Sequence, residues 1–210
     1  MIELKNISFT QQKKTIFKDF NLHIPSQERL VIQGESGAGK TTLLRLIAGL
    51  ETPDSGEIII DGKIATQDKE IHIPPHKRNI SMLFQDLALF PHLTVAQNIT
   101  YALRIQKVPK KAQQEVLEEM LSLVGLKGYE SRDISTLSGG EAQRIALARA
   151  LATKPKIILM DEPLSSLDNK RNKILRKEII KLQETLKFTL VYVTHNEEEA
   201  QAIGNRFLKI

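Results

Sequence analysis

The feature that most constrains how this chain can fold is the glycine-rich stretch GESGAGKTT at residues 34–42. It directly follows RLVIQ, residues 29–33, a short apolar run that predicts a buried strand. Residues 41–50 come next, and their leucines and isoleucines recur at the spacing of a helix. A strand, a glycine loop and a helix in succession predict an α/β fold in which the loop lies at the carboxyl end of a sheet strand.

The same stretch has the pattern G-x-x-x-x-G-K-[ST], whose residue types suit the binding of phosphate. Glycines let backbone N–H groups surround phosphate oxygens, the lysine reaches the β- and γ-phosphates, and the hydroxyl after it can bind Mg²⁺. We therefore predict a phosphate-binding loop in which Thr41 is also a metal ligand. Its residues are Gly34, Glu35, Ser36, Gly37, Ala38, Gly39, Lys40, Thr41 and Thr42.

Strand and helix patterns alternate along the rest of the chain. Strands are predicted at residues 5–9, 57–64, 79–84, 157–160 and 189–194, with an Asp-Gly turn inside the second of these. Helices are predicted at 112–124, 141–152 and 170–181, and the stretch 86–151 has a helical pattern. This alternation predicts a parallel sheet with crossover helices, preceded by short strands and interrupted by a helical lobe.

Composition excludes several classes of protein. The 210 residues include no cysteine, which excludes a disulfide framework and a thiolate metal site. The apolar runs are far shorter than the roughly 20 residues of a membrane-spanning helix, and the first residues do not resemble a secretory signal, so we expect a cytoplasmic protein. The net charge of +5 permits nucleic acid, acidic lipid or nucleotide as a partner without choosing among them.

Polar side chains follow several of the predicted strands. Asp161 and Glu162 end the strand at 157–160, Gln85 follows the strand at 79–84, and His195 follows the strand at 189–194. Each is uninformative alone, since strands often run into polar loops, but the carboxyl ends of parallel strands meet at one edge of a sheet. We predict that Asp161 holds Mg²⁺ through water and that Glu162 polarises an attacking water as general base.

A second glycine-containing stretch, LSGGEAQR at residues 137–144, stands just before the predicted helix at 141–152. Ser138 is a suitable N-cap, and glycines ahead of a helix expose backbone N–H groups that can bind a phosphate. An ordinary flexible cap without a ligand is the alternative interpretation.

With GESGAGKTT, FQ at 84–85, LSGGEAQR, ILMDEP followed by SSLD, and TH at 194–195 in this order, the chain resembles the nucleotide-binding subunits of ABC transporters over essentially its whole length. The resemblance implies an α/β fold with a P-loop NTPase core and a mostly parallel sheet, an N-terminal antiparallel β subdomain and an inserted α-helical subdomain. It implies one domain over residues 1–210, with the ATP-binding core and β subdomain at 1–85 and 152–210 and the helical signature subdomain at 86–151.

The resemblance also implies ATP and Mg²⁺ as cofactors and a head-to-tail dimer of two copies of the chain. In such a dimer Ser138, Gly139 and Gly140 contact the γ-phosphate of the ATP held by the other subunit. Gln85 senses Mg²⁺ and the attacking water, His195 contacts the γ-phosphate, and Asp168 links the two sites. The implied catalytic residues are Glu162, His195 and Gln85, and the implied metal residues are Thr41, Gln85 and Asp161.

The stretch at residues 74–99 resembles the importer branch of this family. That branch implies transmembrane permease subunits, a separate solute-binding protein, no nucleic acid, and a peripheral place at the cytoplasmic face of the membrane. Phe90, Pro91 and His92 are candidate contacts for a permease helix, with the alternative that Phe90 is core of the helical lobe. ATPases of lipoprotein-release or cell-division complexes, and soluble ABC ATPases acting on nucleic acid, are the alternative functions, and no residue indicates a transported substrate.

One position departs from the family pattern. Gln11 occupies the place where relatives carry an aromatic ring that stacks on adenine, which predicts weakened discrimination between ATP and GTP. Phe9 and Phe17 are the candidate replacements for that ring. Relatives also continue beyond NRFLKI, residues 205–210, with another strand and turn.

Overall fold

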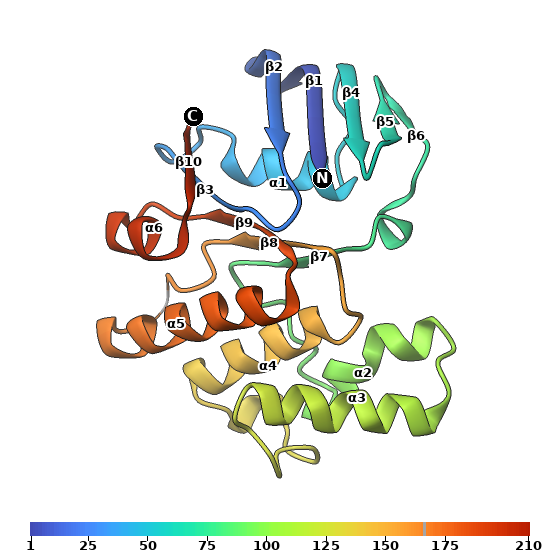
Figure 1. Cartoon of the computed structure of the whole chain (residues 1–210), viewed down its shortest axis with the longest axis vertical. Helices are drawn as coiled ribbons and strands as arrows, with labels where there is room; N and C mark the ends of the chain where they lie inside the picture. Colours follow the sequence, from blue (N-terminus) through green and yellow to red (C-terminus); the bar gives the residue numbers. More distant parts are fainter. Residues whose placement is uncertain (166) are drawn as a thin grey trace. The chain divides into compact units, whose positions relative to one another are not determined.

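A computed structural model describes residues 1–165 and 167–210 of the chain, which form two compact units (Figure 1). The strand-rich unit comprises Met1–Met82, Lys156–Glu162 and Arg176–Ile210. The helical unit comprises Leu83–Pro155 and Pro163–Leu175. The helical unit therefore includes residues on both sides of the predicted stretch 86–151. Among the described residues, no helix combines the length and the apolar character needed to cross a bilayer.

The first sheet of the strand-rich unit is antiparallel and has the strand order β2-β1-β4-β5-β6. Its strands are β1 (Ile2–Gln11), β2 (Lys14–Ile24), β4 (Ser55–Ile60), β5 (Lys63–Gln67) and β6 (Glu70–Ile71). Asp61 and Gly62 both have positive φ between β4 and β5, which matches the hairpin turn that an Asp-Gly pair favours. The predicted strand at 57–64 is therefore two strands joined by this turn.

The second sheet has the order β10-β3-β9-β8-β7. Its strands are β3 (Arg29–Gln33), β7 (Ile80–Leu83), β8 (Ile157–Asp161), β9 (Thr189–Val193) and β10 (Arg206–Lys209). The pairs β10 with β3, β3 with β9 and β9 with β8 are parallel. Every residue of β8 and β9 is buried, as expected where a parallel sheet is covered on both faces. The predicted parallel sheet is confirmed for these pairs.

The core of the strand-rich unit is built around α1 (Lys40–Ala48), which packs against β8 and β9. Leucines and isoleucines of α1 belong to one buried cluster with side chains of both sheets. A short helix, α6 (Glu197–Ile203), packs against β3. The strand β3, the loop after it and the start of α1 are therefore held in place by packing along the helix.

The helical unit contains α2 (Val95–Ile105), α3 (Lys110–Leu123) and α4 (Gly139–Leu151), which contact one another pairwise. Helix α5 (Asn169–Leu186) contributes its residues up to Leu175 to this unit and the remainder to the strand-rich unit. A turn of 3₁₀ helix at Ile134–Thr136 also belongs to this unit, and another at Pro75–Lys77 belongs to the strand-rich unit. The buried apolar residues of the unit include Val95, Ile99, Leu103, Leu117, Met120, Leu121, Ile145, Leu147 and Leu151.

The start of α4 corrects the sequence analysis. The helix was predicted from residue 141, with the two glycines ahead of it, but Gly139 and Gly140 are its first two residues. Ser138 is extended and caps the helix, and Glu141 completes a reciprocal capping box with it. Glycine is tolerated at these two positions because the first N–H groups of a helix have no partner within it.

Candidate functional site

The predicted phosphate-binding loop, residues 34–42, connects β3 to α1 in the strand-rich unit. Gly39 has φ 102°, a conformation that side chains with a Cβ rarely adopt. A Cβ on Gly39 would also come within 2.5 Å of Ile16 Cγ2 and 3.1 Å of Phe17 Cζ. Glycine is therefore required here both by the backbone angle and by the close approach to β2.

The polar groups of this loop suit an anion. Lys40 is buried, and its Nζ donates to the carbonyl oxygens of Gly34 at 2.9 Å and Glu35 at 2.8 Å. In the described part of the chain, α1 has no side-chain cap at its N-terminus and no acidic residue in its first turn. Unpaired N–H groups, the partial positive charge of a helix start and a nearby ammonium group fit the phosphates of a nucleotide.

Asp161 ends β8 and is buried. Burial raises the pKa of Asp161, while a hydrogen bond from the Thr41 hydroxyl acts in the opposite direction. A hydroxyl beside a carboxylate offers the oxygen ligands that Mg²⁺ prefers. Over the described residues, no group of three or more His, Cys, Asp and Glu side chains could hold a metal ion by itself.

Glu162 and His195 lie in direct contact within the strand-rich unit. His195 Nδ1 is 3.0 Å from Glu162 Oε2, and the imidazole is mostly exposed whereas the Glu162 side chain is only 20 % exposed. Glu162 has φ 44°, and its N–H donates to the carbonyl of Val193 at 3.0 Å. The left-handed turn therefore directs the residue after Asp161 to the end of β9, where His195 follows. The structure brings these two predicted residues together.

A buried carboxylate that the sequence analysis did not identify holds the segment before His195. Glu199 Oε2 accepts hydrogen bonds from Thr194 Oγ1 at 2.8 Å and Tyr192 Oη at 3.0 Å. Asn196 caps α6 by accepting from the Glu199 N–H, and burial raises the pKa of Tyr192 well above its ordinary value. The sequence after β9 does not predict this cluster, because a glutamate in a helix is normally expected to be exposed to solvent.

Gln85 is exposed and belongs to the helical unit. Leu87 and Ala88, which follow shortly after, have positive φ. The Leu87 carbonyl accepts a hydrogen bond from Arg149 Nη2 at 2.7 Å, and the Ala88 carbonyl accepts one from Arg149 Nη1 at 2.6 Å. Arg149 is in the last turn of α4, the helix that begins with the signature glycines. The segment after Gln85 is thus attached to the far end of the signature helix, a link that motif spacing did not predict.

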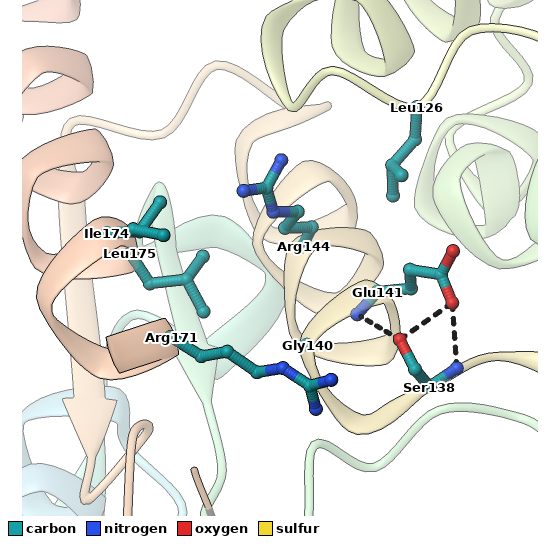
Figure 2. A pocket seen from close by; sticks show the side chains of 8 residues that line it. All are labelled: Leu126, Ser138, Gly140, Glu141, Arg144, Arg171, Ile174 and Leu175. Atoms are coloured by element: carbon teal, nitrogen blue, oxygen red, sulfur yellow. Dashed lines mark hydrogen bonds between the residues drawn. The ribbon is translucent and has the colours of Figure 1, made fainter. Parts of the chain in front are cut away.

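Ser138, Gly140 and Glu141 line a cavity of about 240 Å³ in the helical unit (Figure 2). Its other lining residues are Leu126, Arg144, Arg171, Ile174 and Leu175. Figure 2 shows Arg144 and Arg171 approaching it from α4 and α5. The exposed start of α4 therefore faces a space bordered by two guanidinium groups.

Asp168 caps the start of α5 in the same unit, where its Oδ1 accepts from the N–H groups of Lys170 and Arg171 at 3.1 and 3.0 Å. These backbone hydrogen bonds keep the pKa of Asp168 below its ordinary value. Ser166, the second serine of the SSLD motif, lies outside the described residues.

The candidate docking residues also belong to the helical unit. Phe90 is half-buried, and its ring packs in a tilted arrangement against Tyr101 with 4.6 Å between the ring centroids, whereas Pro91 and His92 are exposed. The buried amide of Asn98 donates to the carbonyl oxygens of Phe90, Leu93 and Thr94, and accepts from the Phe90 N–H. Phe90 is therefore part core and part surface, and the Asn98 side chain is hydrogen-bonded to several backbone groups of its loop.

The structure also bears on the missing adenine ring. Gln11 is exposed at the end of β1, opposite Lys14 across the hairpin. Phe9 and Phe17 are both buried, at 7 % and 5 % exposure. A ring that stacks on a base must expose one face, so the idea that either phenylalanine replaces the missing aromatic residue is wrong for this conformation. Weakened discrimination between ATP and GTP stays a prediction.

Comparisons with known proteins agree with this arrangement. A family model described as ABC transporter matches residues 17–165. A spermidine/putrescine import ATP-binding protein of Clostridium acetobutylicum is 48% identical over 206 residues, which are 98% of this chain and 57% of that protein. A sulfate/thiosulfate import ATP-binding protein of Synechocystis sp. is 46% identical over 207 residues, which are 99% of this chain and 57% of that protein. The chain thus spans little more than half the length of these relatives.

A solved dimer of an ATP-binding cassette, in a post-hydrolysis state with ADP and Pi, is 33% identical to the chain. The match has a TM-score of 0.87 and covers 100% of this chain and 94% of the solved one. The predicted fold class is therefore confirmed, and the chain belongs to the ABC transporter family.

Proposed function

We propose that this chain is the ATP-hydrolysing subunit of an ABC importer, which it powers by closing as a dimer on ATP and opening after hydrolysis. The observation that carries the proposal is the group of side chains at the carboxyl ends of β3, β8 and β9. Lys40 and Thr41 are the last part of the phosphate-binding loop and the first residues of α1. Asp161 is the last residue of β8, and Glu162 follows it and contacts His195. Phosphate-binding donors, a metal-binding carboxylate and a general base thus belong to one unit.

The chain's own groups divide the work. Lys40 exchanges its two loop carbonyls for phosphate oxygens, and the uncapped start of α1 adds backbone donors. Thr41 and Asp161 are the residues that hold Mg²⁺, which neutralises phosphate charge when bound. Glu162 accepts a proton from the attacking water, and the hydrogen bond with His195 holds its carboxylate in position.

The dimer completes each site in this proposal. Ser138 caps α4, Gly139 and Gly140 begin it, and these residues offer N–H and hydroxyl donors to the γ-phosphate of the ATP on the other copy. The solved dimeric cassette with ADP and Pi supports this assembly. Gln85 follows the metal and the attacking water, and Asp168 connects the two sites.

The membrane partners follow from the importer relatives. Transmembrane permease subunits dock against the loop of Phe90, Pro91 and His92, a separate solute-binding protein delivers the solute, and the chain works at the cytoplasmic face of the membrane without nucleic acid. The relatives named above import polyamines or sulfate and thiosulfate, and their shared feature is import.

The test is nucleotide-dependent dimerisation. We expect Glu162→Gln to lower the hydrolysis rate by a factor on the order of 10² to 10⁴, because the base is removed, and to leave ATP binding intact. Light scattering after size-exclusion chromatography should then show this variant as a monomer alone and as a dimer with Mg²⁺-free ATP. Lys40→Ala should bind no nucleotide.

Glu70→Gln is the matched control, because Glu70 is an exposed carboxylate on β6 of the same unit. It should hydrolyse ATP at the parent rate. Normal hydrolysis by Glu162→Gln would show that another group is the base. A variant that binds ATP and stays monomeric at every concentration would contradict dimer closure by this chain.

A further inference from the structure

Ser138 and Glu141 exchange more hydrogen bonds than a helix cap needs. Glu141 Oε2 accepts from the Ser138 N–H at 2.8 Å and from the Ser138 hydroxyl at 2.7 Å, while Ser138 Oγ accepts from the Glu141 N–H at 3.4 Å. Figure 2 shows these three contacts at the start of α4. The Glu141 carboxylate therefore accepts hydrogen bonds from both the hydroxyl and the backbone N–H of Ser138.

Tyr129 holds the other oxygen of the same carboxylate. Its hydroxyl donates to Glu141 Oε1 at 2.6 Å, and the guanidinium of Arg132 lies over its ring at 3.7 Å from the centroid. All four residues belong to the helical unit. The donors from Tyr129 and Ser138 also hold the pKa of Glu141 at about 2, so the carboxylate is charged at neutral pH.

This arrangement competes with the role proposed for Ser138. A serine hydroxyl has one proton, so it cannot donate to the Glu141 carboxylate and to a phosphate oxygen at the same time. A carboxylate next to the arriving γ-phosphate also repels it, because like charges at short range are unfavourable. The contacts with Tyr129 keep the carboxylate in this position.

We propose that Glu141 and Tyr129 form a latch on Ser138, in which the tethered carboxylate occupies the serine hydroxyl until the γ-phosphate displaces it. The latch raises the ATP concentration that dimer closure requires. Glu141 and Tyr129 are positioning residues here, since they act through Ser138. This inference rests on the proposed function, because the displacing phosphate is the one held by the other copy.

The test measures the ATP concentration for half-maximal dimerisation in the Glu162→Gln chain, with Mg²⁺-free ATP and light scattering as the readout. Adding Glu141→Gln keeps an oxygen acceptor for Ser138 and removes the charge. We expect the required ATP concentration to fall about threefold to fivefold, the range for loss of one exposed charge interaction. Adding Tyr129→Phe should lower it less, because the carboxylate stays charged but loses its tether.

Two further variants separate the latch from a capping role. Tyr129→Phe combined with Glu141→Gln should match Glu141→Gln alone, since Tyr129 acts through the carboxylate. Glu115→Gln, an exposed carboxylate on α3 of the same unit, is the charge-matched control and should change nothing. A purely structural cap predicts the opposite sign, because weakening it loosens the start of α4 and raises the ATP requirement.

The outcomes are distinct. A parent chain that dimerises with ATP, with Glu141→Gln unchanged or in need of more ATP, overturns the latch and leaves the proposed function standing. A parent chain that binds ATP and never dimerises overturns both. A direct check uses the nucleotide-free chain, in which Tyr129→Phe should raise the pKa of Glu141 measured by carboxyl NMR, and an unchanged pKa would overturn the tether.

Discussion

At the scale of single residues, Arg78 of the strand-rich unit is a buried charged side chain with several hydrogen-bond partners. Its guanidinium donates to the carbonyl oxygens of Leu46 and Ile47 at the end of α1. It also donates to the carbonyl oxygens of Ile73 and Ala65 and to the Thr66 hydroxyl. Burial lowers the pKa of Arg78 to about 10. One cation thus closes the carboxyl end of the helix whose other end carries the phosphate-binding loop.

We expect Arg78→Met to lower the free energy of unfolding by about 3 kcal/mol, because several buried acceptors lose their donor at once. The urea midpoint followed by circular dichroism is the measurement. Lys77→Met, at the exposed neighbouring position, should stay within about 0.5 kcal/mol of the parent. Equal midpoints for the two variants would show that α1 does not depend on this guanidinium.

Asp161 predicts a pH dependence of stability. Its folded pKa is raised by burial, so the folded state binds this proton more tightly than the unfolded state. Ionisation of Asp161 therefore opposes folding above the unfolded value of 3.8. We expect Asp161→Asn to raise the melting temperature of the nucleotide-free chain at pH 7 and to have no such effect below that value. Glu70→Gln is the control, and a lower melting temperature for Asp161→Asn at pH 7 would contradict the expectation.

At the scale of elements, sequence patterns predicted β3, α3 and β8 to within two residues. The strands β3 and β8 are short apolar runs, and α3 is bounded by Pro109 and Gly125. The start of α4 was placed too late, although the Ser-x-x-Glu pattern of Ser138 and Glu141 is a readable sign of a capping box. The partner Tyr129 could not be predicted, because it meets Glu141 through the fold of the loop before α4.

The candidate site divides in the same way. The loop at 34–42 could be named from its motif, and Asp161 from its place at the end of an apolar strand, while their roles stay predictions. The burial of Glu199, Arg78 and Asn98 could not be predicted from the sequence. A buried charge or amide depends on its hydrogen-bond partners, which the fold brings together.

Asn98 makes a prediction at this scale, because it is fully buried and fixes the loop of residues 90–94. We expect Asn98→Ala to leave the loop carbonyls unpaired and to destabilise the helical unit by about 2 kcal/mol. Hydrogen exchange measured by mass spectrometry should become faster at residues 90–94 and remain unchanged at β8. Gln114→Ala, at an exposed position on α3 of the same unit, serves as the control. Unaltered exchange at 90–94 would show that the loop is held by other contacts.

At the scale of the whole molecule, the docking loop should connect hydrolysis to transport. We expect Phe90→Ala to retain ATP hydrolysis by the isolated chain and to lower solute uptake about tenfold or more in vesicles containing the permease, because a central aromatic contact is lost. The ratio of solute imported to ATP hydrolysed is the measurement. His92→Ala, at an exposed position of the same loop, tests whether the effect is specific to the aromatic ring. A fully coupled Phe90→Ala transporter would remove Phe90 from the interface.

Helix α4 has a second consequence at this scale. Its first residue is a signature glycine, and Arg149 in its last turn binds the backbone just after Gln85. Thirteen helical residues span about 20 Å. In the proposed function, a displacement of the signature end of α4 would therefore reach the backbone after Gln85 through one helix and one arginine, without contacts between further elements.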